Sequence, residues 1–125
     1  MAELVIEKGS KDIIVCFGGS ADAFGGEPPF EFLRFITRVF PDRSAIFYTD
    51  ERRSYYSVGF KGITKNVKES VEYLNEKVKG YERVMFVGTS MGGYAAILFG
   101  SLCKVNKVVA FGPQTTTKVG NYNDL

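Results

Sequence analysis

The stretch VMFVGTSMGGYAAILFG at residues 84–100 decides the fold of this chain. It opens with a short apolar run at 84–87, passes through three small residues and continues into a longer apolar run. Short apolar runs without polar alternation are typical of parallel strands that are covered on both faces. The stretch therefore predicts a buried strand that turns at once into a helix over 91–102. Because that helix is apolar almost all round, we expect it to be largely buried.

Similar apolar runs occur elsewhere along the chain. They are residues 13–17, 45–48 and 108–111, and a shorter run at 4–6 is expected to form an edge strand. Alternation of such strands with helices predicts an α/β fold, a three-layer, doubly wound, mainly parallel sheet of four or five strands with right-handed crossovers. We expect one domain over residues 1–114, followed by a polar, mobile tail at 115–125.

Two helical patterns lie between the predicted strands. The first follows Pro28 and Pro29, which suit a first helical turn, and Pro41 blocks its continuation. Its apolar residues at helical spacing are Phe32, Phe35, Ile36 and Val39. The second pattern, at 67–78, has one apolar face for the core and stops before Gly80.

Composition argues against several classes of function. The 125 residues are 45% apolar and 24% charged with a net charge of +2, and the densest basic site, Arg52-Arg53, is too small to predict nucleic-acid binding. No segment has the apolar length of a signal peptide or a membrane span, so we expect a cytoplasmic protein without a membrane partner. Cys16 and Cys103 lie in apolar surroundings and are expected to be buried thiols. No cluster has the spacing of a metal site, and no cofactor is expected.

Gly88-Thr89-Ser90-Met91-Gly92 matches the pattern G-x-S-x-G between the predicted strand and helix. A tight strand-to-helix turn forces its central residue into a strained conformation and presents that side chain above the sheet edge. The Met91 amide begins the helix, where free N–H groups and the helix dipole favour a developing negative charge. The pattern predicts Ser90 as a nucleophile. The alternative is a glycine-lined helix start that permits close packing or binds a phosphate, although no Walker A string is present.

A second motif, Phe17-Gly18-Gly19-Ser20, ends the predicted strand at 13–17. Acyl transfer needs a second amide donor to the oxyanion from a loop after an adjacent strand, and glycines let that backbone approach a substrate. We therefore expect the Gly19 or Ser20 amide to be this donor. An ordinary strand-end turn is the alternative, and the presence of the serine motif favours the oxyanion role.

With these motifs, residues 12–114 resemble the amino-terminal half of the α/β-hydrolase superfamily, and residues 88–96 are similar to the elbow of serine esterases and thioesterases. The resemblance implies that Ser90 is the nucleophile and that the Met91 amide and an amide from 18–20 form the oxyanion hole. It implies a small acyl or ester ligand. It also implies that the strand at 13–17 lies between those at 45–48 and 84–87, that 108–111 lies outside 84–87, and that 109–115 line a pocket.

The chain departs from that superfamily at the remaining catalytic groups. It contains no histidine, and Asp124 is the only acid after Ser90. In this fold the acid and the histidine follow the nucleophile, and a serine hydroxyl without a base is a weak nucleophile. Asp124 is not expected to complete a triad, and Asp22, in the candidate oxyanion loop, is interpreted as a turn or capping residue.

Three explanations fit this departure. The chain is an incomplete or inactive fragment of a longer hydrolase, which is the explanation we favour; it is a non-catalytic binding or interaction module that keeps the fold; or a second chain supplies the missing groups. The strand at 108–111 is also expected to leave an unpaired apolar edge, which predicts a homo-oligomer.

Two loops have more than one interpretation. Tyr55, Tyr56 and Phe60 either wall a pocket beside the serine or, as we favour, belong to a loop that packs over the sheet. The glycine-rich loop at 21–27, which contains Phe24, suits a mobile lip over the site.

Overall fold

The computed structural model describes residues 3–19, 30, 32–50 and 54–112 of the chain. Strands and helices alternate in it as the sequence predicts. In chain order the elements are β1 (Glu3–Ile6), β2 (Asp12–Phe17), α1 (Leu33–Val39), β3 (Ser44–Tyr48), α2 (Val67–Val78), β4 (Arg83–Thr89), α3 (Met91–Cys103) and β5 (Lys107–Phe111). The predicted helix at 67–78 is confirmed at both ends.

The described strands form one five-stranded sheet in the order β1-β3-β2-β4-β5. Along β3-β2-β4-β5 every pair is parallel, and β1 pairs antiparallel with β3 at the edge. The predicted positions are confirmed, since β2 lies between β3 and β4 and β5 lies outside β4. The register aligns Phe17 with both Tyr48 and Gly88, so the carboxyl ends of β2, β3 and β4 meet at one edge.

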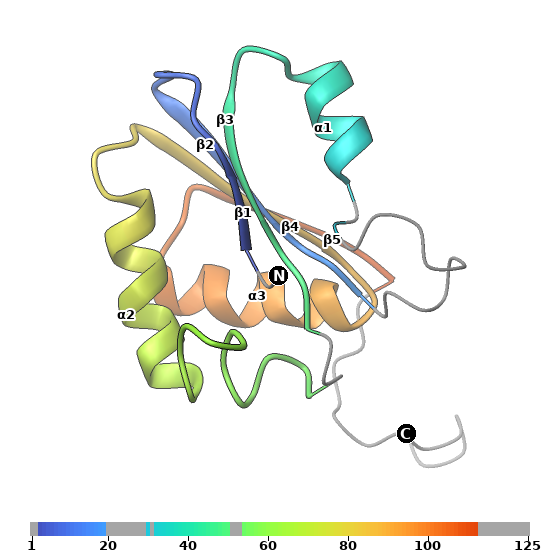
Figure 1. Ribbon diagram of the computed structural model, residues 1–125, viewed down its shortest axis with the longest axis vertical. Helices are drawn as coiled ribbons and strands as arrows, with labels where there is room; N and C mark the ends of the chain where they lie inside the picture. The colour runs from blue at the N-terminus through green and yellow to red at the C-terminus, as the bar shows by residue number, and fades with distance from the viewer. Residues whose placement is uncertain (1–2, 20–29, 31, 51–53, 113–125) are drawn as a thin grey trace.

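Helices cover both faces of this sheet and make three layers (Figure 1). Val15 and Phe17 of β2 share a core with α2 and α3, whereas Ile14 and Cys16 share the opposite core with α1. Successive residues of β2 therefore face different cores, and all residues from 13 to 17 are buried. Burial on both faces explains why the strands are continuous apolar runs.

Phe17, the last residue of β2, is the centre of an aromatic cluster. Its ring contacts five others at centroid distances from 5.3 to 6.5 Å, those of Tyr48, Tyr56, Phe60, Phe86 and Phe99. Tyr48 and Phe60 also stack on each other at 4.1 Å. Such pairs contribute about 0.5–1.5 kcal/mol each beyond their buried area. The cluster joins β2, β3, β4, α3 and the segment after β3 beneath the carboxyl edge of the sheet.

The first helix is shorter and less buried than its sequence pattern predicts. α1 begins at Leu33, after Phe32 in the left-handed region (φ 71°), and Ile36 is its one buried residue. Phe35 and Val39 are 55% and 47% exposed. A seven-residue helix has about two turns. Ile36 and the partly buried Leu33 pack against the core, whereas Phe35 and Val39 lie on the outer side.

α3 is buried on one side only, which corrects the prediction of a largely buried helix. Seven of its 13 residues are buried, whereas Ile97 and Leu102 are 40% and 50% exposed. Cys103 is half-buried rather than buried, and partial burial raises its pKa to about 11, while Cys16 is fully buried. α3 contacts β2, β4, β5 and α2, and its side chains that face none of these elements stay exposed.

Several predictions concern residues outside the described ranges. They are the helix start at Pro28 and Pro29, the loop at 21–27 and the tail at 115–125. In the part of the chain that the structure describes, no helix has the length and apolar character that crossing a membrane requires.

Asn66→Ala is expected to destabilise the domain by about 1 kcal/mol, because the Asn66 side chain accepts the Glu69 amide at the start of α2. Urea unfolding followed by circular dichroism measures the change. Asn66→Asp keeps the acceptor and adds a charge that suits a helix N-terminus, so its unfolding midpoint is expected to equal or exceed that of the wild type. Equal losses in the two variants would contradict the capping role.

Candidate functional site

Ser90 lies at the turn between β4 and α3 in a conformation that few side chains adopt. Its φ and ψ are 51° and −119°, and it is the N-cap residue of α3 although its side chain caps no amide. Outside glycine, such conformations cost about 1–3 kcal/mol and persist where the surroundings enforce them. Ser90 is also only half-buried. The strained strand-to-helix turn expected from the sequence is therefore present.

Gly88 and Gly92 leave no room for a side chain on either side of this turn. A Cβ on Gly88 would overlap the carbonyl group of Gly92, and a Cβ on Gly92 would overlap the carbonyl oxygens of Phe17 and Gly18. These neighbours are backbone atoms, which cannot rotate away as a flexible side chain can. β4, α3 and the end of β2 therefore touch backbone to backbone at this point.

Hydrogen bonds hold the turn from two directions. The Ser90 amide donates to the Phe111 carbonyl at the end of β5 (3.0 Å), and the Ser90 carbonyl accepts the Tyr94 amide in the first turn of α3 (3.1 Å). The amides of residues 91–93 precede that first helical donor and so have no partner within the helix. These amides and the helix dipole make the start of α3 a place that stabilises negative charge beside Ser90.

The loop after β2 lies against the start of α3. Gly18 and Gly19 are buried, and the Gly18 amide donates to the Tyr48 carbonyl at 2.9 Å. The close contact of Gly92 with the end of β2 brings this loop beside the turn. Gly19 is one residue beyond that contact and is buried. Ser20, the other expected donor, lies outside the described residues.

A further loop, after β3, reaches the same edge of the sheet. Asp50 is 5% exposed, and its carboxylate accepts the amides of Ser54 and Tyr56 at 2.8 Å each. Tyr56 and Phe60 are fully buried, which confirms for both the interpretation of a loop packed over the sheet. Tyr55 and Tyr56 have positive φ values of 59° and 62°.

Tyr55 is the member of this loop that reaches the serine turn. Its ring meets the Tyr94 ring edge-on at 5.5 Å, and the Tyr94 amide is bonded to Ser90. From the sequence, we consider this loop as a pocket wall beside the serine but favour packing over the sheet, and Asp50 is not singled out. The available signal was Asp50, an acid that follows an apolar strand at the edge where parallel sheets bind ligands.

No described residue is arranged as a base for Ser90. The chain contains no histidine, and the Ser90 hydroxyl makes no hydrogen bond to any other described residue. Asp50, the buried acid at this edge, is occupied by the loop amides. Asp22 and Asp124 lie outside the described residues. Among the residues that are described, no three acidic, cysteine or histidine side chains gather into a metal site.

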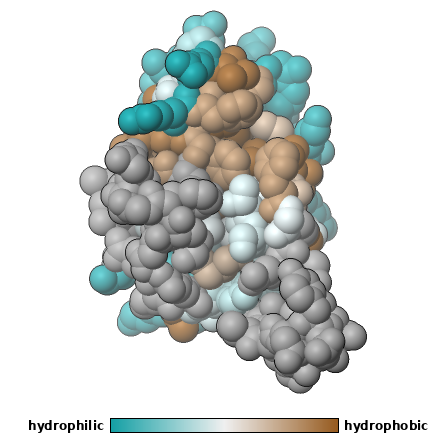
Figure 2. Space-filling model, turned by 90° about the vertical axis from the view of Figure 1, so that its right-hand side faces the viewer, coloured by the Kyte–Doolittle hydropathy of each residue, from teal (hydrophilic) through white to brown (hydrophobic). Residues whose placement is uncertain are grey.

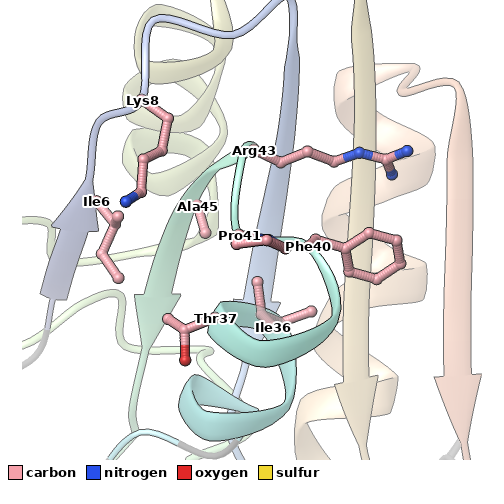
Figure 3. A pocket seen from close by; sticks show the side chains of 8 residues that line it. All are labelled: Ile6, Lys8, Ile36, Thr37, Phe40, Pro41, Arg43 and Ala45. Atoms are coloured by element: carbon pink, nitrogen blue, oxygen red, sulfur yellow. The ribbon is translucent and has the colours of Figure 1, made fainter.

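A small cavity of about 130 Å³ lies at the opposite end of the strands (Figure 3). Its lining comes from β1, α1, the start of β3 and the adjoining loops, and comprises Ile6, Lys8, Ile36, Thr37, Phe40, Pro41, Arg43 and Ala45. Figure 3 shows the Lys8 amine beside Ile6, with Arg43 extending away from it. Arg43 lies 3.7 Å from the Asp12 carboxylate and covers the Phe40 ring. Because Ala45 is near the amino end of β3, this cavity is separate from Ser90.

Comparisons with protein-family models, with curated proteins and with solved structures give no match. The resemblance to α/β-hydrolases therefore rests on the motifs at 17–20 and 88–92 and on the sheet topology. That topology is an α/β architecture of the expected class, and it identifies no family.

Gly88→Ala and Gly92→Ala are each expected to destabilise the domain by more than about 3 kcal/mol, or to prevent folding, because the new Cβ overlaps backbone atoms. Gly62→Ala is the matched control. Gly62 also has a positive φ (79°) but open space around it, so its loss is limited to about 1 kcal/mol of backbone strain. Urea unfolding measures all three, and similar losses at 62 and 92 would contradict the close approach.

Ser90→Gly is expected to be more stable than Ser90→Ala by about 1 kcal/mol. Both substitutions remove the hydroxyl, and only glycine relieves the strain of a φ of 51°. Chemical unfolding of the two variants under identical conditions measures the difference. An alanine variant as stable as the glycine variant would show that the turn stores no strain.

Proposed function

We propose that this domain supplies the nucleophile and the oxyanion hole of a serine-dependent acyl-transfer site of the esterase or thioesterase type. The observation that carries the proposal is the backbone conformation of Ser90, enclosed by two glycines that admit nothing larger. Ser90 is the nucleophile. The Met91 amide and an amide of the loop after β2, from Gly19 or Ser20, are the donors to the oxyanion.

In the proposed step the Ser90 oxygen attacks the carbonyl carbon of an ester or thioester. A C–O bond forms, the serine proton passes to a base, and the carbonyl oxygen becomes an oxyanion. Collapse of this intermediate expels the alcohol or thiol, which takes the proton from the base, and water then hydrolyses the acyl-serine by the same route. One well-placed amide donor contributes about 2.7–4 kcal/mol to such a step.

The base in this proposal is an imidazole from outside the chain, because the chain contains no histidine. A homodimer cannot provide it, since two identical copies contain none either. The missing groups therefore belong to further polypeptide joined to this domain or to a different partner chain. Without them, catalysis is expected to fall several orders of magnitude below that of an intact site.

A second candidate function, a non-catalytic interaction module, is favoured by the open edge of the sheet. Within the described residues β5 pairs only with β4. Val108 and Phe111 of β5 are 37% and 55% exposed, and Phe35 and Val39 of α1 are exposed as well. Figure 2 shows a broad hydrophobic area on the side of the molecule where α1 and β5 lie in Figure 1. Because exposed apolar edges pair readily with other strands, the proposed assembly is a homo-oligomer formed through β5.

A fluorophosphonate probe tests the nucleophile. The domain alone is expected to be labelled slowly at Ser90, and added imidazole, acting as a diffusible base, is expected to raise the rate at least about tenfold. Mass spectrometry of the labelled peptide locates the adduct. Ser90→Ala is the control, and its labelling is expected to stay at background with and without imidazole.

Two results would count against this proposal. Labelling that imidazole does not change, spread over other hydroxyl groups, would contradict the acyl-transfer role and favour the interaction module. Rapid labelling of Ser90 without imidazole would show a base within this chain and contradict its assignment to other polypeptide.

Val108→Lys tests the proposed edge pairing. It is expected to raise the dimer Kd at least about tenfold, because a lysine on an edge strand opposes strand addition. Size-exclusion chromatography with light scattering over a concentration series measures the Kd. Val58→Lys, at an apolar residue of similar exposure (40%), is the control and is expected to leave it unchanged. A wild-type domain that stays monomeric at the highest concentration would exclude the assembly.

A further inference from the structure

A buried tyrosine hydroxyl holds the peptide that follows β2. The Tyr56 hydroxyl donates to the Gly18 carbonyl at 2.8 Å and lies 3.3 Å from the Tyr48 carbonyl. Tyr56 is fully buried, so water does not compete for this bond. The Gly18 amide is fixed as well, because it donates to the Tyr48 carbonyl. The N–H and the carbonyl group of Gly18 are therefore both hydrogen-bonded to residues of β3 or of the loop that follows it.

Tyr56 is itself held by its surroundings. Its amide donates to the buried Asp50 carboxylate at 2.8 Å, and its ring packs edge-on against Phe17 at 5.7 Å. Tyr55 and Tyr56 are consecutive non-glycine residues in the left-handed region, which is costly unless other contacts enforce it. The Asp50 carboxylate, bonded to the amides of Ser54 and Tyr56, supplies that enforcement.

A fixed carbonyl at Gly18 also fixes the next amide. The peptide unit is planar and trans, so the Gly18 carbonyl and the Gly19 N–H point in opposite directions within one plane. Two consecutive glycines would otherwise let this plane rotate readily. The hydrogen bond from the Tyr56 hydroxyl restrains the rotation of this peptide plane. The restrained peptide belongs to the loop that the contact of Gly92 with the end of β2 brings beside Ser90.

We propose that Tyr56 is a positioning residue for the acyl-transfer site: its hydroxyl keeps the Gly19 amide in the orientation that donates to the oxyanion formed at Ser90. This inference rests on the function proposed above. In this proposal the loop after β3 supports the site. Asp50 fixes the conformation of that loop through its hydrogen bonds, and Tyr56 bonds the loop after β2.

The test uses Ser90→Cys, because a thiolate is nucleophilic without a neighbouring base and so reports on the oxyanion hole. Cys103→Ala removes the half-buried native thiol, and Cys16 is fully buried.

Two reactions of the introduced thiolate are compared. With p-nitrophenyl acetate a C–S bond forms, an oxyanion develops and nitrophenolate leaves. With methyl methanethiosulfonate an S–S bond forms and methanesulfinate leaves, and no oxyanion develops. The ratio of the two rates cancels changes in the thiol pKa.

Tyr56→Phe, added to this background, keeps the ring and removes the hydroxyl. It is expected to lower the acetylation rate about tenfold, less than the 10² to 10³ for outright loss of a donor, while the thiosulfonate rate changes by less than about twofold. Tyr73→Phe is the matched control, since the Tyr73 hydroxyl bonds Glu3 of the edge strand β1 and not the loop after β2, and the ratio is expected to stay unchanged. Asp50→Asn loosens the loop by another route and is expected to lower the same ratio.

An unchanged ratio in a folded Tyr56→Phe protein overturns the positioning role. If that variant does not fold, an unchanged ratio in Asp50→Asn does so. A different result would contradict the proposed function. It is a Ser90→Cys protein with Tyr56 intact whose ratio of ester to thiosulfonate reactivity equals that of glutathione, a thiol without an oxyanion hole.

Discussion

Three stretches of backbone touch where β4 turns into α3, and the rest of the structure is arranged around that contact. No Cβ fits at Gly88 or Gly92, because the space is filled by carbonyl groups of α3 and of the end of β2. The chain between these glycines has no freedom to relax, so Ser90 is held at a φ of 51°. The same contact brings the buried glycines after β2 beside the first amides of α3. A steric constraint between backbones thus produces both halves of the candidate site.

The aromatic cluster around Phe17 keeps this contact in place. Phe17 is the residue before Gly18, and its ring meets those of Phe86 in β4 and Phe99 in α3. Movement of β2 relative to the turn would have to disturb these buried rings together. Tyr56 belongs to the same cluster through its ring and reaches the Gly18 carbonyl through its hydroxyl. Core packing and the orientation of a loop peptide are therefore coupled through one side chain.

The sequence predicts well those features that depend on residues close together in the chain. The strands are continuous apolar runs because both faces are covered, and α2 runs from Val67 to Val78 as its periodicity indicates. The turn at Ser90 is predictable because the spacing of its glycines is a local steric requirement. The exposure of Phe35 in α1 and Ile97 in α3 was not predictable, since it depends on what lies beside those helices in space. The bond from Tyr56 to Gly18 joins residues 38 positions apart through a backbone conformation that no tyrosine propensity indicates.

The surroundings of the Ser90 hydroxyl bear differently on the two candidate functions. In the described residues this hydroxyl caps no amide of α3 and makes no other hydrogen bond. A glycine would adopt the same backbone conformation without the cost of about 1–3 kcal/mol that a side chain incurs there, a sizeable part of a typical domain stability of about 5–15 kcal/mol. An interaction module that binds through β5 gains nothing from serine at this position. A strained, half-buried hydroxyl beside the first amides of α3 suits a ligand or a reacting group, and this favours the proposed acyl transfer over the proposed edge pairing.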